Sequence, residues 1–318
     1  MANLVSIARR TRASLRRDGW GKTARKGVSR LLALPGVLSG YLDYRLNPHA
    51  LRVPKGTDWP YDPQAVRAQL QQSGVLVESY HVDVTDFKRW CQSAYYADSY
   101  YHGSPARTEK LLEHYLSLQL LPPITPRSVI IDVACAGSPF TAAVQRLYGC
   151  TVYRQDLVYP EGIHRAPDGM EEIGGNAAFM PVADSFASGL VSHCAFEMFR
   201  GDNDSLFIQE AARILQPGGR LVIIPLYLSS LHHHLVDPLA DRRGVSYDPG
   251  ARIVYRPDYY RVASARFYSV EAFMRRVVEH RSGLLLKVIF VENEKEVDPS
   301  CYCRFVAVFE RSAESKVE

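Results

Sequence analysis

The sequence predicts a doubly wound α/β fold built on a mostly parallel sheet. From residue 128 onward, short β-branched apolar runs alternate with segments whose apolar residues recur at helical spacing. Such alternation implies parallel strands joined by right-handed crossovers. The last two apolar runs have no predicted helix between them, which favours an antiparallel C-terminal edge strand. With 318 residues, 47% of them apolar, the chain can form one such core with extensions.

The first 60 residues are predicted to form a basic N-terminal arm and a linker. Residues 1–45 contain ten Lys and Arg against Asp18 and Asp43, a net charge of +8, which leaves −4 for the remainder. Residues 47–62 are rich in Pro, Gly and polar side chains, so a boundary is expected near residue 60. The arm would attract anionic lipid, nucleic acid or an acidic partner for the same electrostatic reason. A solvated tail and an organellar transit peptide are the alternatives.

The hydropathy pattern favours a cytoplasmic protein. No apolar run approaches the roughly 20 residues of a spanning helix, and arginines stand where a signal peptide carries its apolar stretch. Leu4, Ala8, Thr11 and Leu15 share one helical face, which is typical of a helix lying on a membrane surface. We therefore expect peripheral contact at the inner membrane face through the arm. Nucleic acid is not an expected partner, because the rest of the chain is net acidic.

Residues 61–125 are predicted to form a helical cap or lid, with apolar side chains at helical spacing up to Leu121 and an end at Pro122. Within this region, residues 94–103 contain four tyrosines close to a glycine. Such a segment indicates a ligand-facing loop, in which Tyr100 and Tyr101 would contact the substrate. Tyrosines that cover a core edge with their hydroxyls in water are an equal alternative.

Residues 126–318 are predicted to form the cofactor-binding catalytic domain. Its strands are expected at residues 128–133, 151–154, 189–194, 220–227, 284–291 and 303–309. Its helices are expected at residues 140–148, 206–215 and 270–278. Gly149 suits a helix C-cap, and residues 216–219 suit a turn.

The ends of the first two strands locate a ligand site, because ligands of open parallel sheets bind at the carboxyl ends of the strands. Asp132 begins a loop of small residues that leads into a helix, and such a loop lets the backbone approach a ligand closely. Asp156 ends the second strand, where a carboxylate can accept hydrogen bonds from both hydroxyls of a ribose.

Over residues 128–228 the sequence resembles the class I S-adenosylmethionine-dependent methyltransferases, particularly the small-molecule group that includes quinone-biosynthesis enzymes. The resemblance is carried by residues 128–138, 175–186 and 211–227. It implies a Rossmann-like fold and S-adenosylmethionine as cofactor. Asn176 replaces the family's usual aspartate, and its amide can still meet the adenine amino group. The cofactor-binding residues that it implies are Asp132, Ala134, Ala136, Gly137, Asp156, Asn176, Ala177 and His193.

The loop departs from the family pattern, since Ala134-Cys-Ala-Gly-Ser138 stands where Gly-x-Gly-x-Gly is usual. Alanine disfavours positive φ, so we expect a different path for this loop. The missing glycines also argue against a nicotinamide dehydrogenase. A catalytically silent scaffold on the same fold remains an alternative.

His193 and Glu197 are the candidate catalytic residues, at the end of the fourth strand and in the loop after it. An imidazole suits proton removal from a poor nucleophile such as a sugar hydroxyl, and Glu197 could orient it or bind the acceptor. A buried imidazole bonded to backbone is the alternative for His193, and a structural ion pair is the alternative for Glu197.

His232 and Tyr268 are predicted acceptor contacts on the far side of the fifth strand. Three consecutive histidines begin at His232, but adjacent histidines rarely converge on one ion, so no metal is expected. Aromatic and basic side chains around Tyr268 suit a glycan, although core packing explains them equally well. The sequence therefore predicts O-methylation of a sugar in surface polysaccharide biosynthesis, with a lipid- or quinone-type metabolite as the alternative acceptor.

Overall fold

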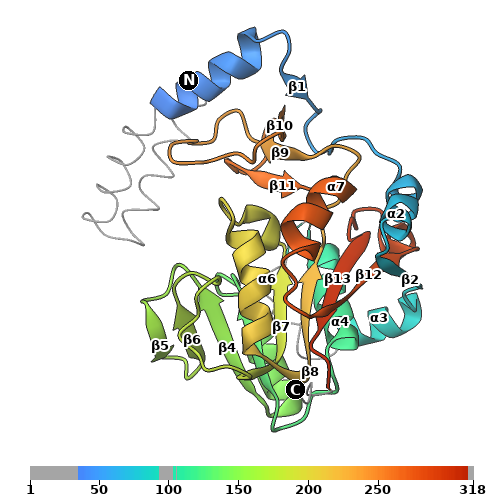
Figure 1. The fold of residues 1–318 in the computed structure, drawn as a ribbon, viewed down its shortest axis with the longest axis vertical. Helices are drawn as coiled ribbons and strands as arrows, with labels where there is room; N and C mark the ends of the chain where they lie inside the picture. The colour runs from blue at the N-terminus through green and yellow to red at the C-terminus, as the bar shows by residue number, and fades with distance from the viewer. Residues whose placement is uncertain (1–34, 93–102, 105, 314–318) are drawn as a thin grey trace. The chain divides into compact units, whose positions relative to one another are not determined.

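The computed structural model describes residues 35–92, 103–104 and 106–313 (Figure 1). The chain forms two compact units. The second unit comprises residues 60–233, 248–250 and 266–318, and the first comprises the preceding residues together with 234–247 and 251–265. The division at residues 59 and 60 coincides with the predicted boundary. The predicted domain 126–318 is wrong as a continuous unit, because residues 234–265 belong largely to the first unit.

A nine-stranded sheet forms the centre of the second unit. In spatial order its strands are β2 (Leu76–Tyr80), β12 (Leu285–Val291), β13 (Phe305–Glu310), β8 (Leu215–Ile224), β7 (Ala187–His193), β3 (Val129–Val133), β4 (Thr151–Asp156), β6 (Glu171–Gly174) and β5 (Gly162–Arg165). β13 is antiparallel to both of its neighbours, β5 is antiparallel to β6, and the other pairs are parallel. The predicted mostly parallel sheet with antiparallel pairing at the C-terminal end is confirmed.

Helices cover both faces of this sheet. They are α2 (Pro63–Gln72), α3 (Val84–Cys91), α4 (Arg107–Leu120), α5 (Phe140–Tyr148), α6 (Asn203–Ile214), α7 (Val270–Phe273) and α8 (Glu294–Val297), with the one-turn helix η1 (Phe196–Met198) and the π-helical turn η2 (Met274–Val278). Local signals fix several ends: Asp62 caps α2 through the N–H of Gln64, and Gly149 ends α5 with a φ of 64°.

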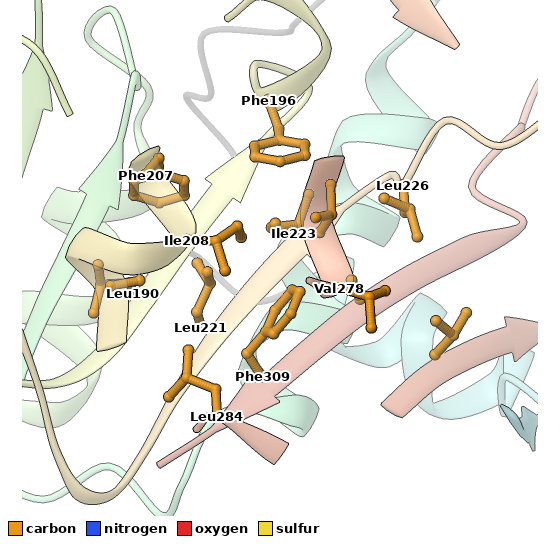
Figure 2. Close-up of a cluster of buried hydrophobic side chains, with 14 of the residues drawn as sticks. Leu190, Phe196, Phe207, Ile208, Leu221, Ile223, Leu226, Val278, Leu284 and Phe309 are labelled. Atoms are coloured by element: carbon orange, nitrogen blue, oxygen red, sulfur yellow. The ribbon is translucent and has the colours of Figure 1, made fainter. Parts of the chain in front are cut away.

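Alternation along the strands divides the apolar core into two layers. Ile131, Leu190 and Leu221 pack with α6 and α7 on one face, and Figure 2 shows part of this cluster. Their sequence neighbours Ile130 and Val191 pack with α4 and α5 on the other face. Successive residues of a strand point to opposite faces, so a sheet covered on both sides needs apolar residues at nearly every position.

The predicted helical cap at residues 61–125 is wrong as a separate domain. Residues 76–80 of this segment form the strand β2. β2 pairs in parallel with β12, with Val77 opposite Val288. α4 packs its buried residues, among them Leu112 and Leu116, into the core layer that it shares with α5. This part of the chain therefore completes the second unit.

The first unit contains a helix at residues 35–46, together with β1 (Leu51–Arg52), β10 (Arg252–Tyr255) and all but the first residue of β9 (His233–Val236). The small sheet has the order β1, β10, β9 and β11 (Ala265–Phe267). Most of the predicted basic arm, including its face at residues 4–15, lies outside the described residues. Among the described helices, none combines the length and the apolar content that a bilayer span requires.

Candidate functional site

A cavity of about 530 Å³ opens at the carboxyl ends of β3, β4, β6 and β7. This size lies in the usual range for small-molecule pockets. Its lining consists of short segments that follow these strands: Ala134, Gln155, Asp156, Leu157, Asn176, Ala177, Cys194, Ala195, Met198, Phe199, Arg200 and Asn203. Four predicted cofactor residues are in this lining, namely Ala134, Asp156, Asn176 and Ala177.

The loop after β3 has positive φ angles, which the glycines usual in the family would adopt without strain. Ala134 has a φ of 54°, Ala136 a φ of 45° and Gly137 a φ of 86°. The expectation that alanines would redirect this loop is therefore wrong. Two contacts hold the strained backbone in place: Ala134 N–H donates to Gln155 Oε1 at 3.2 Å, and Ala136 N–H donates to Asp156 Oδ2 at 2.8 Å. Ala136 and Gly137 do not line the cavity.

Asp156 links the loop to the ribose position that the sequence predicts. Its side chain is 9% exposed and lines the cavity. Oδ2 accepts from Ala136 N–H, and Oδ1 accepts from Val158 N–H at 3.1 Å. Each carboxylate oxygen has a further lone pair, so both can still accept hydrogen bonds from a diol. The donor and acceptor set thus fits a nucleoside.

Gln155 is a positioning residue that the sequence did not single out. Its Nε2 donates to Gly175 O at 2.6 Å while its Oε1 accepts from Ala134 N–H. One buried amide therefore ties the loop after β3 to the segment after β6. No local motif indicates this role, because the partners lie about twenty residues away on either side.

Asn176 and Ala177 form the other end of the cavity. Asn176 Oδ1 accepts from Ala178 N–H at 3.0 Å, and its Nδ2 donates to Asn203 Oδ1 at 3.0 Å. Oδ1 keeps a lone pair that an adenine amino group could use. Leu157 adds an exposed apolar surface beside Asp156, which suits the face of a base. The cavity therefore combines a carboxylate, an amide and an exposed apolar side chain.

Asp132 and His193 are placed differently from the prediction. Asp132 is fully buried, and its Oδ1 lies 3.2 Å from His193 Nδ1. The other imidazole nitrogen lies 2.8 Å from Ser117 Oγ on α4, and the ring packs against Phe140 at 4.6 Å. Neither residue lines the cavity. The cofactor-binding role of Asp132 and the cofactor-binding and catalytic roles of His193 stay predictions, which this placement does not support. The end of β7 turns this imidazole towards α4, into a buried polar pair.

A buried polar cluster adjoins the cavity where β7 and β8 end. Cys194 belongs to both, because it lines the cavity while its Sγ lies 3.0 Å from Tyr227 Oη and 3.5 Å from Tyr302 Oη. From α4, Lys110 Nζ donates to both oxygens of Glu113 at 2.8 and 3.0 Å. We call this set, with Glu197, the polar cluster.

Glu197 lies on η1 between Ala195 and Met198, both of which line the cavity. Its side chain is buried, and Oε2 has no hydrogen-bond partner among the described residues. Burial raises the pKa of Glu197 to about 7, although the nearby Lys110 ammonium acts in the opposite direction. A carboxyl group of this kind can take a proton near neutral pH. The structural ion pair that was the alternative for Glu197 is not formed by direct contact among the described residues.

The predicted acceptor contacts at His232 and Tyr268 are wrong. His232 is mostly buried, with Nδ1 3.1 Å from Phe267 O and Nε2 3.1 Å from Asp248 Oδ2. Tyr268 is fully buried and donates its hydroxyl to Asp204 at 2.7 Å. Both side chains belong to a buried charged network, which for Tyr268 is the packing alternative. Tyr100 and Tyr101 lie outside the described residues.

The three consecutive histidines turn to different partners: His232 to Phe267 O, His233 to Leu231 O and His234 to Ser264 Oγ. In the part of the chain that the structure describes, no group of three or more suitable side chains is placed to hold a metal ion.

Comparison with known proteins places the chemistry in the second unit. Residues 131–223 match a family model described as a methyltransferase domain. This segment runs from β3 to β8 and contains every strand that borders the cavity. The chain thus contains a methyltransferase domain, which acts with S-adenosylmethionine as its cofactor. No curated protein matches the sequence significantly.

Several solved methyltransferase structures are similar to this chain. The putative methyltransferase bound to its Trm112 activator from Haloferax volcanii is 12% identical and has a TM-score of 0.42, over 71% of this chain and 98% of that one. The 1,6-didemethyltoxoflavin-N1-methyltransferase from Burkholderia thailandensis is 12% identical with a TM-score of 0.42, over 80% and 93%. Geranyl diphosphate C-methyltransferase from Streptomyces coelicolor is 13% identical with a TM-score of 0.40, over 63% and 75%. Likeness at this level identifies no acceptor.

Proposed function

We propose that this methyltransferase acts on a hydroxyl group of a small-molecule or glycan acceptor, with Glu197 as the general base. The observation that carries the proposal is the buried Glu197 carboxyl, which has an unused oxygen in a polar cluster that adjoins the cofactor cavity. A hydroxyl is a poor nucleophile and gains from a base that removes its proton during transfer. Bound S-adenosylmethionine supplies an electrophilic methyl group, and Glu197 accepts the proton of the acceptor.

The chemistry of the polar cluster favours a sugar over a quinone-type acceptor. Tyr227 and Tyr302 offer hydroxyls and aromatic faces, and the Lys110–Glu113 pair offers an ammonium and a carboxylate. Such a mixture suits a ring that carries several hydroxyls. We accordingly propose O-methylation of a sugar, as would occur in surface polysaccharide biosynthesis. A lipid- or quinone-type metabolite is the second candidate, favoured by the ring contact between Tyr227 and Phe267 at 4.9 Å.

Cofactor binding is tested first, with S-adenosylhomocysteine as the calorimetric probe. We expect the wild-type protein to bind it and Asp156→Ala to lose at least tenfold in affinity, because the ribose loses its acceptor. Glu161→Ala is the matched control, since its exposed carboxyl follows the same strand without lining the cavity. Equal affinity of all three proteins would remove Asp156 from the ribose site.

Acceptor class is tested with S-adenosylmethionine and two panels, one of glycosides and nucleotide-activated sugars and one of quinols. Methylated products are identified by mass spectrometry. We expect product from the sugar panel and a loss of roughly 100-fold or more in turnover for Glu197→Gln, with unchanged affinity for S-adenosylhomocysteine. Methylated quinols alone would replace the sugar proposal. Full turnover by Glu197→Gln would exclude Glu197 as the base.

A further inference from the structure

The helix at residues 35–46 presents an apolar stripe to solvent. Leu38, Leu42 and Leu46 recur at every fourth position and are 57%, 44% and 73% exposed. Residues four apart share one face of a helix, so the three leucines form a continuous row, and Tyr41 lies beside it. Single exposed leucines are ordinary on proteins, whereas a row along a whole short helix indicates a binding face.

The opposite side of the same helix is fixed within the first unit. Gly40 is buried, and Asp43 accepts a hydrogen bond from the Tyr255 hydroxyl. The ring of Tyr44 packs edge-on against that of Tyr255 at 5.7 Å, and its carbonyl accepts from Arg52 Nε at 2.9 Å. These contacts fix the helix through its polar side, so the side that carries the three leucines faces solvent.

The helix and the sequence before it carry a net positive charge. Asp43 is the only acidic residue of the helix, and its carboxylate is engaged with Tyr255. Arg45 of the same helix is exposed. Residues 1–34, which lead directly into the helix, carry nine Lys and Arg against Asp18, a net charge of +8. An apolar row with cations beside it is the combination that amphipathic helices use at membrane surfaces.

We propose that the face formed by Leu38, Tyr41, Leu42 and Leu46 binds the surface of an anionic lipid bilayer. The leucines enter the boundary between headgroups and acyl chains. Arg45, and the net charge of +8 in the sequence before the helix, favour an anionic surface over a neutral one. Charge complementarity selects this occupant over a second copy of the chain, because two copies would bring two segments of net charge +8 together.

The experiment uses the full chain and vesicle flotation. Vesicles of phosphatidylcholine alone are compared with vesicles that also contain phosphatidylglycerol. We expect binding only to the second kind, and a loss of at least tenfold for Leu42→Glu. Leu147→Glu is the matched control, because Leu147 lies on α5 and is 48% exposed, close to the 44% of Leu42. Its binding should equal that of the wild type.

Several results would overturn the proposal. Absence of flotation with either vesicle would exclude the bilayer as partner. Equal flotation of wild type and Leu42→Glu would show that the basic segment binds without the leucine face. A dimer in light scattering that Leu42→Glu dissociates, without flotation, would assign the face to a second copy. As a second readout, Tyr41→Trp should show added fluorescence that brominated lipid quenches, and unquenched added fluorescence would also overturn the proposal.

Discussion

Glu109 shows at the scale of one residue what burial does to a carboxyl group in this protein. Its Oε2 accepts from Tyr302 N–H at 2.8 Å and from Cys303 N–H at 3.4 Å, while Oε1 is buried without a partner among the described residues. Burial, reinforced by the nearby Glu113 charge, raises the pKa of Glu109 to about 8. The folded protein therefore holds this proton more tightly than the unfolded chain does.

The raised pKa of Glu109 determines how the stability of the protein changes with pH. A group whose pKa is raised on folding stabilises the fold at pH below its ordinary value of 4.5, and this contribution is lost as pH rises through about 8. Glu109→Gln cannot ionise, so it does not lose this contribution. Its free energy of unfolding should therefore rise relative to that of the wild type, by on the order of 3 kcal/mol, as the pH increases from about 5 to about 9. Urea unfolding of both proteins at the two pH values measures this. Exposed Glu279→Gln is the control, and parallel pH profiles for Glu109→Gln and wild type would contradict the prediction.

Ala134 and Ala136 carry backbone strain where the loop borders the cavity, since each has a positive φ. A left-handed conformation costs a residue with a Cβ about 1 kcal/mol. Glycine removes this cost but adds freedom to the unfolded chain. We expect Ala136→Gly to stabilise the protein by roughly 0.5 kcal/mol, measured by urea unfolding. Ala143→Gly in the buried part of α5 should destabilise it instead, and destabilisation by both would contradict the strain argument.

At the scale of elements, a buried charged network fixes the segment between η1 and α6. Arg266 donates to Asp248 at 2.6 and 2.8 Å and to the carbonyls of Phe199 and Gly201 at 2.9 and 3.0 Å. Arg276 completes the network through Asp204 at 2.7 Å. Phe199 and its neighbours line the cavity, so the network sets one wall of the cofactor site.

Arg266→Met should therefore weaken both the fold and cofactor binding. It removes the guanidinium that donates two hydrogen bonds to the buried carboxylate of Asp248, at a cost of about 3–5 kcal/mol. It also removes the donor to the two carbonyls that hold the cavity wall. We expect lower stability in urea, and lower affinity for S-adenosylhomocysteine under conditions where the variant is folded. Arg275→Met, in a half-exposed side chain on η2, should change neither. A folded Arg266→Met with wild-type affinity would show that the wall needs no such anchor.

The sequence predicts elements well where a pattern is long enough to show its period. The helix at 140–148 and the strands at 129–133 and 285–291 lie close to their expected ranges. β2, β5 and β6 were missed because four or five residues give too few alternations to distinguish a strand from a loop. The two alanines did not redirect the loop as expected, because hydrogen bonds to Gln155 and Asp156 of another strand hold its backbone at positive φ.

The same reasoning explains which site residues were found. Asp156, Asn176 and Ala177 directly follow strands, so topology alone brings them to the cavity. Arg200 and Asn203 were missed, because their position depends on the network around Arg266. His193 also ends a strand, but its ring is drawn to Asp132 and Ser117, which the sequence does not place beside it. Contacts between distant segments therefore decide whether the side chain of a residue at the end of a strand reaches the cavity.

At the scale of the whole molecule, the division into two units predicts which residues cofactor binding protects from hydrogen exchange. Every residue that lines the cavity belongs to the second unit. A ligand that binds only the folded state, at a concentration 100 times its dissociation constant, stabilises it by about 2.7 kcal/mol, which slows exchange through local opening about 100-fold. With S-adenosylhomocysteine, hydrogen exchange should slow in residues 134–138, 155–158, 176–178 and 194–203. Residues 35–59 and 251–265 of the first unit should exchange as before, and Asp156→Ala should show no slowing at all. Slowing of equal size in both units would mean that the cofactor acts on the molecule as one cooperative body, in which case the membrane-binding face proposed for residues 35–46 would be linked to occupancy of the active site.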